Sequence, residues 1–208
     1  LTGKTSDSFW RFFGGLHHVL ERRVAKRARA IMVFNDQYAQ TVKQWNQRAH
    51  FFPTWFDPAL IEQEPAHENP NSIIWVGRFE VPKDPELAVA VLEALVSVDP
   101  TTAWTLEMLG SGTRFESVAL LVERLEPNVK GRITLHGRVG PKQVAQDMAR
   151  GGVFLMTSHP GYEGFARVLV EAMASGLPAV VTEGSDTGGI VRDGVTGYTC
   201  DRNPLNIA

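Results

Sequence analysis

Short apolar segments alternate with helical segments along residues 72–200, and this pattern restricts the fold more than any other feature. The apolar segments lie at residues 72–77, 104–110, 133–137, 153–158 and 178–182, with a shorter one at 197–200. The segments between them space their apolar residues as helices do, at 85–98, 113–125, 141–149 and from near Gly164 to residue 175. Strands that are apolar throughout are buried on both faces, so helices must cover both sides of the sheet. We therefore predict an α/β fold with a Rossmann-like parallel sheet.

The first part of the chain has fewer elements of the same kind. Residues 29–34 and 49–53 have the composition of short buried strands, with a helical segment at 36–45 between them. Another helical segment, at 7–28, precedes them. This is β/α alternation with too few strands for a sheet of its own. We interpret this region as the end of a domain.

A segment rich in Pro, Glu and Asn separates the two regions. It covers residues 57–72 and has no sustained apolar period, which is typical of a linker. We therefore predict a remnant of a first domain at 1–55, a linker at 56–72 and a second domain at 73–208.

Composition restricts the class of protein. The chain has 208 residues, a net charge of −2, 43% hydrophobic residues and 21% charged residues, which is typical of a soluble globular protein. This charge balance gives no electrostatic basis for binding nucleic acid. Cys200 is the only cysteine, which excludes an internal disulfide and fits a reducing compartment. Because no apolar run reaches the ~18–20 residues of a membrane span and no signal peptide is recognisable, we expect a cytoplasmic protein.

The loops that follow the strands are where a ligand is expected, since parallel sheets bind ligands at the carboxyl ends of their strands. Four loops qualify, at residues 77–85, 110–113, 137–141 and 158–165. In the first of them, Arg78 and Lys83 can hold a phosphate pair, the arginine as a fork and the lysine as a mobile point charge. The alternative is that both are ordinary loop charges and that Gly110 and Gly112 are turn residues rather than points of close approach to a ligand.

Two glutamates frame the last of the predicted helices. If the helix begins near Gly164, its free N–H groups form an anion site at the strand ends. Glu163 and Glu171 are eight positions apart, ~12 Å along a helix axis, which matches the length of a sugar–diphosphate–ribose unit. Carboxylates are suited to accept hydrogen bonds from vicinal hydroxyls. The alternative is that Arg167, Glu171 and Ser175, spaced by four, form a polar stripe that faces solvent.

These segments resemble a known family. "EGFARVLVEAMASGLPAVV" is similar to the E-x7-E signature of the retaining glycosyltransferases with the GT-B fold, of the family 4 (group 1) type. "VGRFEVPKD" resembles the family's segment with an arginine and a lysine after a strand. "LGSG" and "LHGRV" fall where the family has glycine-bearing loops, and "GGIVRDGVTGY" resembles the segment that closes its nucleotide-sugar site. Residues 21–45 and 51–60 are similar to the end of the family's first domain and its crossover linker.

The resemblance implies a role for each candidate residue. Arg78 and Lys83 would hold the donor diphosphate, Glu163 would contact the hydroxyls of the donor sugar, and Glu171 would bind the ribose. The backbone N–H groups of residues 165–168 would face sugar and phosphate, and the loop at Arg138 and Val139 would lie against the base. Glu163, Arg78 and Lys83 are the implied catalytic residues. The implied donor site comprises Gly77, Arg78, Lys83, Gly110, Gly137, Arg138, Val139, Glu163, Gly164, Phe165, Ala166, Arg167, Val168 and Glu171.

The resemblance also implies a reaction. A UDP- or GDP-sugar would donate a hexosyl group, with retention of configuration and without a metal or cofactor, to a carbohydrate, lipid-linked or small-molecule acceptor. Residues 1–55 would then be the remnant of the acceptor domain, and 73–208 a donor domain truncated at its C-terminus, so we expect this chain alone to transfer no sugar. The alternatives are a non-catalytic nucleotide-binding module, which would not need Glu163, and a GT-B sugar-nucleotide epimerase, a group that lacks E-x7-E.

The N-terminal helical segment allows a further hypothesis. Residues 6–29 carry aromatic residues at Phe9, Trp10, Phe12 and Phe13, followed by basic residues up to Arg29. Such a segment can lie at the inner face of the membrane, near a lipid-linked acceptor. The sequence favours the alternative, a docking helix with a solvated basic face, because Gly14 and Gly15 interrupt it.

Overall fold

The chain divides into two compact units, Leu1–Thr54 and Trp55–Ala208. The computed structural model describes residues 8–61 and 68–208, with the side chains of the first helix described from Gly15 onward. The hypothesis of an interfacial segment rests on aromatic residues at positions 9–13. Their side chains lie outside the described part of the structure. Within the described ranges, no helix combines the length and apolar content needed to cross a bilayer.

The first unit is a small α/β assembly. It contains α1 (Ser8–Arg27), β1 (Ile31–Val33), α2 (Asp36–Lys43) and β2 (Ala49–Phe51). Strands β1 and β2 pair in parallel, and Asn35 caps α2 by accepting from the backbone N–H of Tyr38 at 2.8 Å. The prediction that both strands are buried was wrong, because Met32 of β1 is 67% exposed and His50 of β2 is exposed as well. In the described part of this unit, α2 packs against one face of the strand pair, around Val33 and Ala49.

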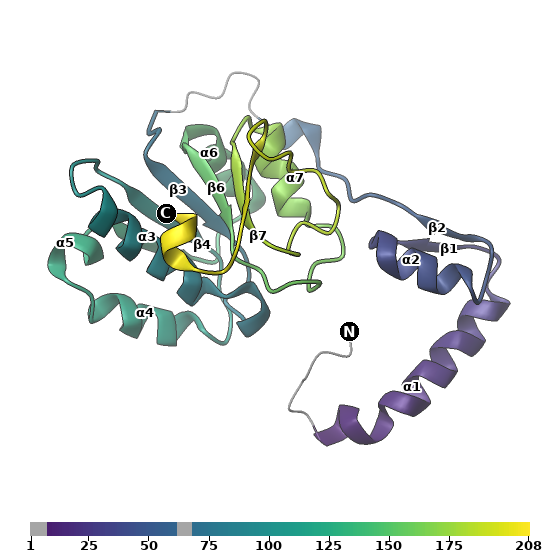
Figure 1. Ribbon diagram of the computed structural model, residues 1–208. Helices are drawn as coiled ribbons and strands as arrows, with labels where there is room; N and C mark the ends of the chain where they lie inside the picture. The colour runs from purple at the N-terminus through teal and green to yellow at the C-terminus, as the bar shows by residue number, and fades with distance from the viewer. Residues whose placement is uncertain (1–7, 62–67) are drawn as a thin grey trace. The chain divides into compact units, whose positions relative to one another are not determined.

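The second unit is built on a six-stranded parallel sheet (Figure 1). Its strands are β3 (Ser72–Val76), β4 (Thr105–Leu109), β5 (Ile133–Gly137), β6 (Val153–Met156), β7 (Ala179–Thr182) and β8 (Gly197–Cys200). Their spatial order is β5-β4-β3-β6-β7-β8, and every pairing is parallel. This is the strand order of dinucleotide-binding Rossmann folds, in which the order reverses between the two central strands. Here that reversal lies between β3 and β6.

Helices cover both faces of the sheet, as predicted. One face carries α3 (Pro85–Val98), α4 (Phe115–Glu123) and α5 (Pro127–Lys130), and the short α8 (Pro204–Ile207) packs beside α3. The opposite face carries α6 (Pro141–Arg150) and α7 (Arg167–Ala174) (Figure 1). Strand β3 serves both cores, because Ile73 and Trp75 point to the first and Ile74 to the second. The edge strand β5 departs from the prediction of continuous burial, since its residues alternate between partly buried and exposed.

Two short 3-10 turns complete the second unit. They are η1 (Pro58–Leu60) and η2 (Val81–Lys83). The first belongs to the segment predicted as a linker, and it lies against α6. Asp57 accepts from the backbone N–H of Ala59 at 3.0 Å and so begins this turn.

Glycines at the strand ends allow neighbouring backbones to meet. A Cβ at Gly110 would collide with the carbonyl oxygen of Gly77, and one at Gly112 would collide with that of Phe79. Gly110 also has a φ of +140°, a backbone conformation that residues other than glycine rarely adopt. Both glycines therefore let the ends of β3 and β4 pack together. Gly110 also borders the cavity described next, whereas Gly112 does not line it.

Candidate functional site

A cavity of about 400 Å³ opens at the carboxyl ends of the strands in the second unit. All four loops selected from the sequence contribute to its wall, together with α6, α7 and the segment around η1. Eleven of the fourteen residues expected at the site line it: Gly77, Arg78, Lys83, Gly110, Arg138, Val139, Glu163, Ala166, Arg167, Val168 and Glu171. The parallel topology thus brings together residues that are up to 94 positions apart, from Gly77 to Glu171.

Three expected residues do not line the cavity. Gly137 ends β5 with a φ of +67°, and its carbonyl accepts from the N–H of Gly110 at 2.8 Å. The carbonyl of Gly164 accepts from the Thr187 hydroxyl at 2.6 Å. The ring of Phe165 lies so close to Gly188 that a Cβ there would collide with it. These three residues support the loops around the cavity rather than forming its wall.

The two expected phosphate-binding cations have different surroundings. Arg78 is exposed, and its guanidinium donates to the Tyr162 hydroxyl at 2.5 Å. Lys83 is nearly buried, with 14% of its side chain exposed, and its ammonium group forms an ion pair with Glu163, whose side chain is 12% exposed. The Ser158 hydroxyl donates to the same carboxylate oxygen of Glu163 at 2.7 Å. Lys83 is therefore an anchored charge, in contrast to the mobile point charge that the sequence suggested.

The lysine is followed by a residue in an unusual backbone conformation. Asp84 has φ 46° and ψ 64°, and it is the single non-glycine residue with positive φ in the described ranges. Aspartate tolerates this left-handed conformation better than most residues. Its carboxylate accepts from the N–H of Leu87 at 3.2 Å, which caps α3. The chain thus turns sharply between Lys83 and α3.

Helix α7 starts later than predicted. Its first residue is Arg167, after an extended Ala166 that no side chain caps, rather than a residue near Gly164. Ala166 is buried in the core beside α7, and the bond from Thr187 holds the carbonyl of Gly164, so the preceding segment keeps a non-helical path. Glu163 consequently lies outside the helix. The ~12 Å spacing derived from helical rise therefore does not describe its separation from Glu171.

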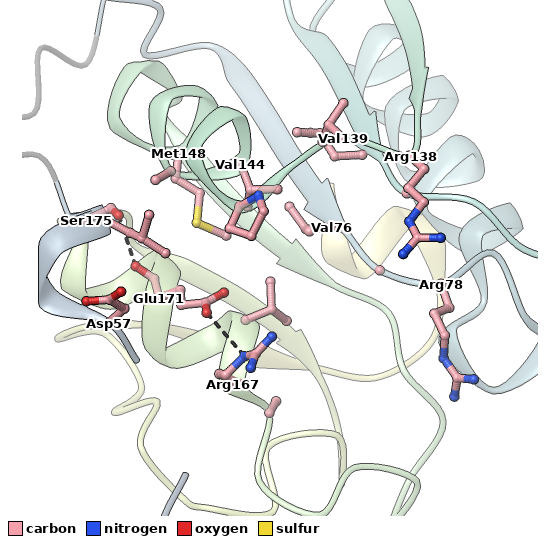
Figure 2. Close-up of a pocket in the computed structure, with 18 of the residues that line it drawn as sticks. Asp57, Val76, Arg78, Arg138, Val139, Val144, Met148, Arg167, Glu171 and Ser175 are labelled. Carbon is pink, nitrogen blue, oxygen red and sulfur yellow. Dashed lines mark hydrogen bonds and ion pairs between the residues drawn. The ribbon is translucent and has the colours of Figure 1, made fainter. Parts of the chain in front are cut away.

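Glu171 faces the cavity from the middle of α7 (Figure 2). Its carboxylate oxygen lies 3.3 Å from Nε of Arg167, one helical turn earlier. Burial raises the pKa of Glu171, and the nearby Arg167 charge partly counteracts this. Ser175 is 1% exposed and its hydroxyl donates to the Glu171 carbonyl at 3.0 Å. The alternative of a solvent-facing stripe is therefore wrong for Glu171, which is 24% exposed, and for Ser175, whereas Arg167 is 64% exposed at the rim of the cavity.

Several wall residues were missed by sequence reasoning. Figure 2 shows Asp57 near Ser175 and Glu171, whereas Arg78 and Arg138 stand on the opposite side of the cavity. Apolar side chains from α6 and η1 fill the wall between polar groups. The missed residues are Asp57, Leu60, Ile61, Val76, Leu109, Pro141, Val144, Ala145, Met148 and Ser175. An Asp-Pro pair at 57–58 is a turn-initiating signal, and it was the available hint that the linker contains structure.

Among the described residues that line the cavity there is no histidine. His136 sits in β5, where its Nε2 is 2.6 Å from a carboxylate oxygen of Glu107. Among the described residues, one group of side chains is close enough to share a metal ion, namely His17, His18 and Glu21 on α1 of the first unit. Glu21 already interacts with His18 and with the Tyr38 hydroxyl. None of these residues lines the cavity.

Comparison with known proteins identifies the family. Residues 70–208 match the family model of glycosyl transferases group 1. The chain belongs to the group 1 glycosyltransferases. Glycogen synthase of Mycobacterium tuberculosis is 30% identical over 131 residues, which cover 63% of this chain and 30% of that protein. N-acetyl-alpha-D-glucosaminyl L-malate synthase of Bacillus anthracis is 29% identical over 111 residues, covering 53% of this chain and 28% of that protein.

Solved structures agree on the fold of this group 1 chain. Anabaena Alr3699/HepE, solved with UDP and glucose, superposes with a TM-score of 0.75 at 20% identity, covering 95% of this chain and 56% of that one. The predicted fold class, a parallel sheet with helices on both faces as found in GT-B glycosyltransferases, is confirmed. The chain spans about a third of the length of the curated relatives that it matches.

Proposed function

We propose that this chain is chiefly the donor-binding half of a retaining, metal-independent glycosyltransferase of the family 4 type. Its substrate would be a UDP- or GDP-hexose, and its acceptor a carbohydrate, a lipid-linked molecule or a small molecule. One observation carries the proposal: a single cavity at the strand ends combines Arg78 and Lys83 with the carboxylates of Glu163 and Glu171. Two cations suit a diphosphate, and two carboxylates suit sugar hydroxyls at either side of it.

In this proposal the cations stabilise the leaving group. Negative charge grows on the nucleoside diphosphate as its bond to the sugar breaks. Fixed positive groups at that point stabilise the transition state more than the bound substrate. Arg78, Lys83 and the uncapped amino end of α7 would supply this charge. In other enzymes a metal ion has the same task.

The carboxylates would orient the two ends of the donor. Glu163 would bind the sugar hydroxyls while Ser158 and Lys83 hold its position. Glu171 would accept from the ribose, and Arg138 with Val139 would lie against the base. Lys83 can contact a phosphate and Glu163 together, because an ammonium group has three N–H donors. No side chain is proposed as a covalent nucleophile.

Calorimetry tests the proposed function. We expect the 208-residue chain to bind UDP or GDP at one site, and to bind the corresponding nucleoside far more weakly. Mass spectrometry after incubation with sugar nucleotides and acceptors should detect no transferred sugar, because an acceptor must also be held in reacting geometry. Absence of binding to every nucleoside diphosphate would contradict the donor site. Sugar transfer by this chain would mean that an acceptor site lies within these residues, and would contradict the assignment of residues 1–55 to a remnant of the acceptor domain.

Helix α1 leaves two interpretations open, a docking helix or a segment at an anionic membrane surface. Its exposed apolar residues Leu16, Val19, Leu20 and Val24 recur at helical spacing, and basic residues follow them up to Arg27. An apolar face of this kind can pack against another part of the protein or lie in a membrane surface, so it fits both interpretations. Because docking is favoured, we expect the chain to stay in the supernatant when vesicles containing phosphatidylserine are pelleted. Sedimentation with anionic but not with neutral vesicles would favour the membrane interpretation.

A further inference from the structure

Arg202, in the segment between β8 and α8, contacts several elements near the cavity without lining it. One terminal nitrogen of its guanidinium donates to the carbonyl of Thr157 at 2.8 Å and to that of Ser158 at 2.9 Å. The other forms an ion pair with the carboxylate of Asp84. We infer that Arg202 is a positioning residue, which holds the two loops that carry Lys83 and Glu163 in register with each other. This inference rests on the proposed function.

The first loop is held through Asp84, the residue directly after Lys83. One carboxylate oxygen of Asp84 caps α3, and the other receives Arg202. The hydroxyl of Thr157 lies 2.8 Å from the carbonyl oxygens of both Lys83 and Asp84. Positive φ at Asp84 costs free energy for a residue other than glycine, so this turn depends on such contacts.

The second loop is held through the end of β6. Thr157 and Ser158 follow this strand, and Arg202 occupies both of their carbonyl groups. Ser158 in turn donates its hydroxyl to Glu163 at 2.7 Å. One guanidinium thus joins the backbone that supports Glu163 to the turn that supports Lys83.

The chemistry of this contact requires an arginine. Its planar group donates in several directions at once, toward two carbonyls and one carboxylate. A lysine has three N–H donors, but they share one nitrogen, so it cannot span the carbonyls and the carboxylate as the two terminal nitrogens of Arg202 do. About three quarters of the side chains of Arg202 and Asp84 are shielded from solvent, with 26% and 25% exposed. We therefore expect the loops to shift when Arg202 is removed, which would separate Lys83 from a bound phosphate.

Hydrogen exchange on the ligand-free chain tests the contact directly. We compare Arg202→Ala with Arg132→Ala, a matched control. The guanidinium of Arg132, just before β5, donates to the carbonyls of Thr102 and Asn128. Peptides covering residues 79–88 and 155–165 should exchange about tenfold faster in Arg202→Ala and remain unchanged in the control. Unchanged exchange in these peptides would overturn the inference. Asp84→Asn, which keeps the side-chain volume but removes the ion pair, provides the same comparison if Arg202→Ala does not fold.

Nucleotide affinity tests the consequence. The affinity for the nucleoside diphosphate should fall about tenfold in Arg202→Ala, since small displacements of a binding group have large effects. The nucleoside affinity should change less, and Arg202→Lys should recover part of the loss. Equal losses for both ligands, or none, would overturn the positioning role. If the wild-type chain binds no nucleoside diphosphate, the proposed function fails, and hydrogen exchange still decides whether Arg202 holds the loops.

Discussion

Lys83→Ala should weaken nucleoside diphosphate binding by about 1.5–3 kcal/mol, or roughly 10- to 150-fold. The lysine is nearly buried and is fixed by Glu163, so its charge lies at a defined point of the cavity. Removing it takes away a charge-assisted hydrogen bond to phosphate. It also leaves the Glu163 carboxylate without the ion pair that compensates its charge, next to an anionic ligand. Calorimetric titration with the diphosphate and with the nucleoside measures the difference, and the nucleoside affinity should stay nearly constant.

Two further variants separate the causes of this loss. Lys130→Ala removes an exposed lysine that pairs with Glu123 at 2.6 Å outside the cavity, and it should leave both affinities unchanged. Lys83→Ala combined with Glu163→Gln should bind the diphosphate better than Lys83→Ala alone, because repulsion by the carboxylate is removed. Equal losses for diphosphate and nucleoside in Lys83→Ala would show that the lysine does not contact phosphate.

Glu171→Gln and Glu163→Gln should have different ligand profiles. Glu171→Gln should weaken every ligand that contains ribose, by about 1–3 kcal/mol, because an amide replaces a charged acceptor. Glu163→Gln should spare the free nucleoside diphosphate and weaken the sugar nucleotide alone. The two carboxylates occupy different parts of the site. Glu171 lies within α7, whereas Glu163 precedes this helix and is held by Lys83 and Ser158, so we expect them to contact different parts of the ligand.

A titration of the nucleoside, the nucleoside diphosphate and the sugar nucleotide against both variants measures this division. Glu183→Gln, at an exposed position outside the cavity, serves as the control and should match the wild type. Identical profiles for Glu171→Gln and Glu163→Gln would contradict the separate roles.

The pH dependence of binding should follow from the environment of Glu171. Burial raises the pKa of this carboxyl group above its ordinary value, against the opposing effect of Arg167. The ionised carboxylate accepts more strongly from ribose hydroxyls than the protonated carboxyl group does. Nucleoside affinity should therefore fall as the pH is lowered through this raised pKa, at a higher pH than for an ordinary glutamate. Glu171→Gln should remove this component of the pH profile, and an unchanged profile would contradict it.

The fold was largely predictable because its signals are local and repeated. Apolar strands such as residues 72–77 and helices such as 85–98 differ clearly in their spacing of apolar residues. A parallel sheet then brings the ends of its strands to one edge, which placed Arg78, Lys83 and Glu163 near one another. The role of Glu171 did not follow from this argument, because it lies within α7; the residues alone left a solvent-facing stripe open, and the resemblance to the family favoured a ribose contact.

Other features depend on contacts between distant residues. The ion pair of Lys83 with Glu163 joins positions 80 residues apart, and no local sequence pattern predicts it. The start of α7 was misjudged because burial of Ala166 and the bond to the Gly164 carbonyl outweigh helical propensity in that segment. The turn at Asp57 was taken as linker because its packing against α6 is a tertiary contact.

The most direct test of the central claim is a crystal structure of this chain with a bound nucleoside diphosphate. We predict that the diphosphate lies against Arg78 and Lys83, with the ribose hydroxyls at the carboxylate of Glu171. A nucleotide bound elsewhere, or one bound in this cavity with its phosphates away from Arg78 and Lys83, would contradict the account.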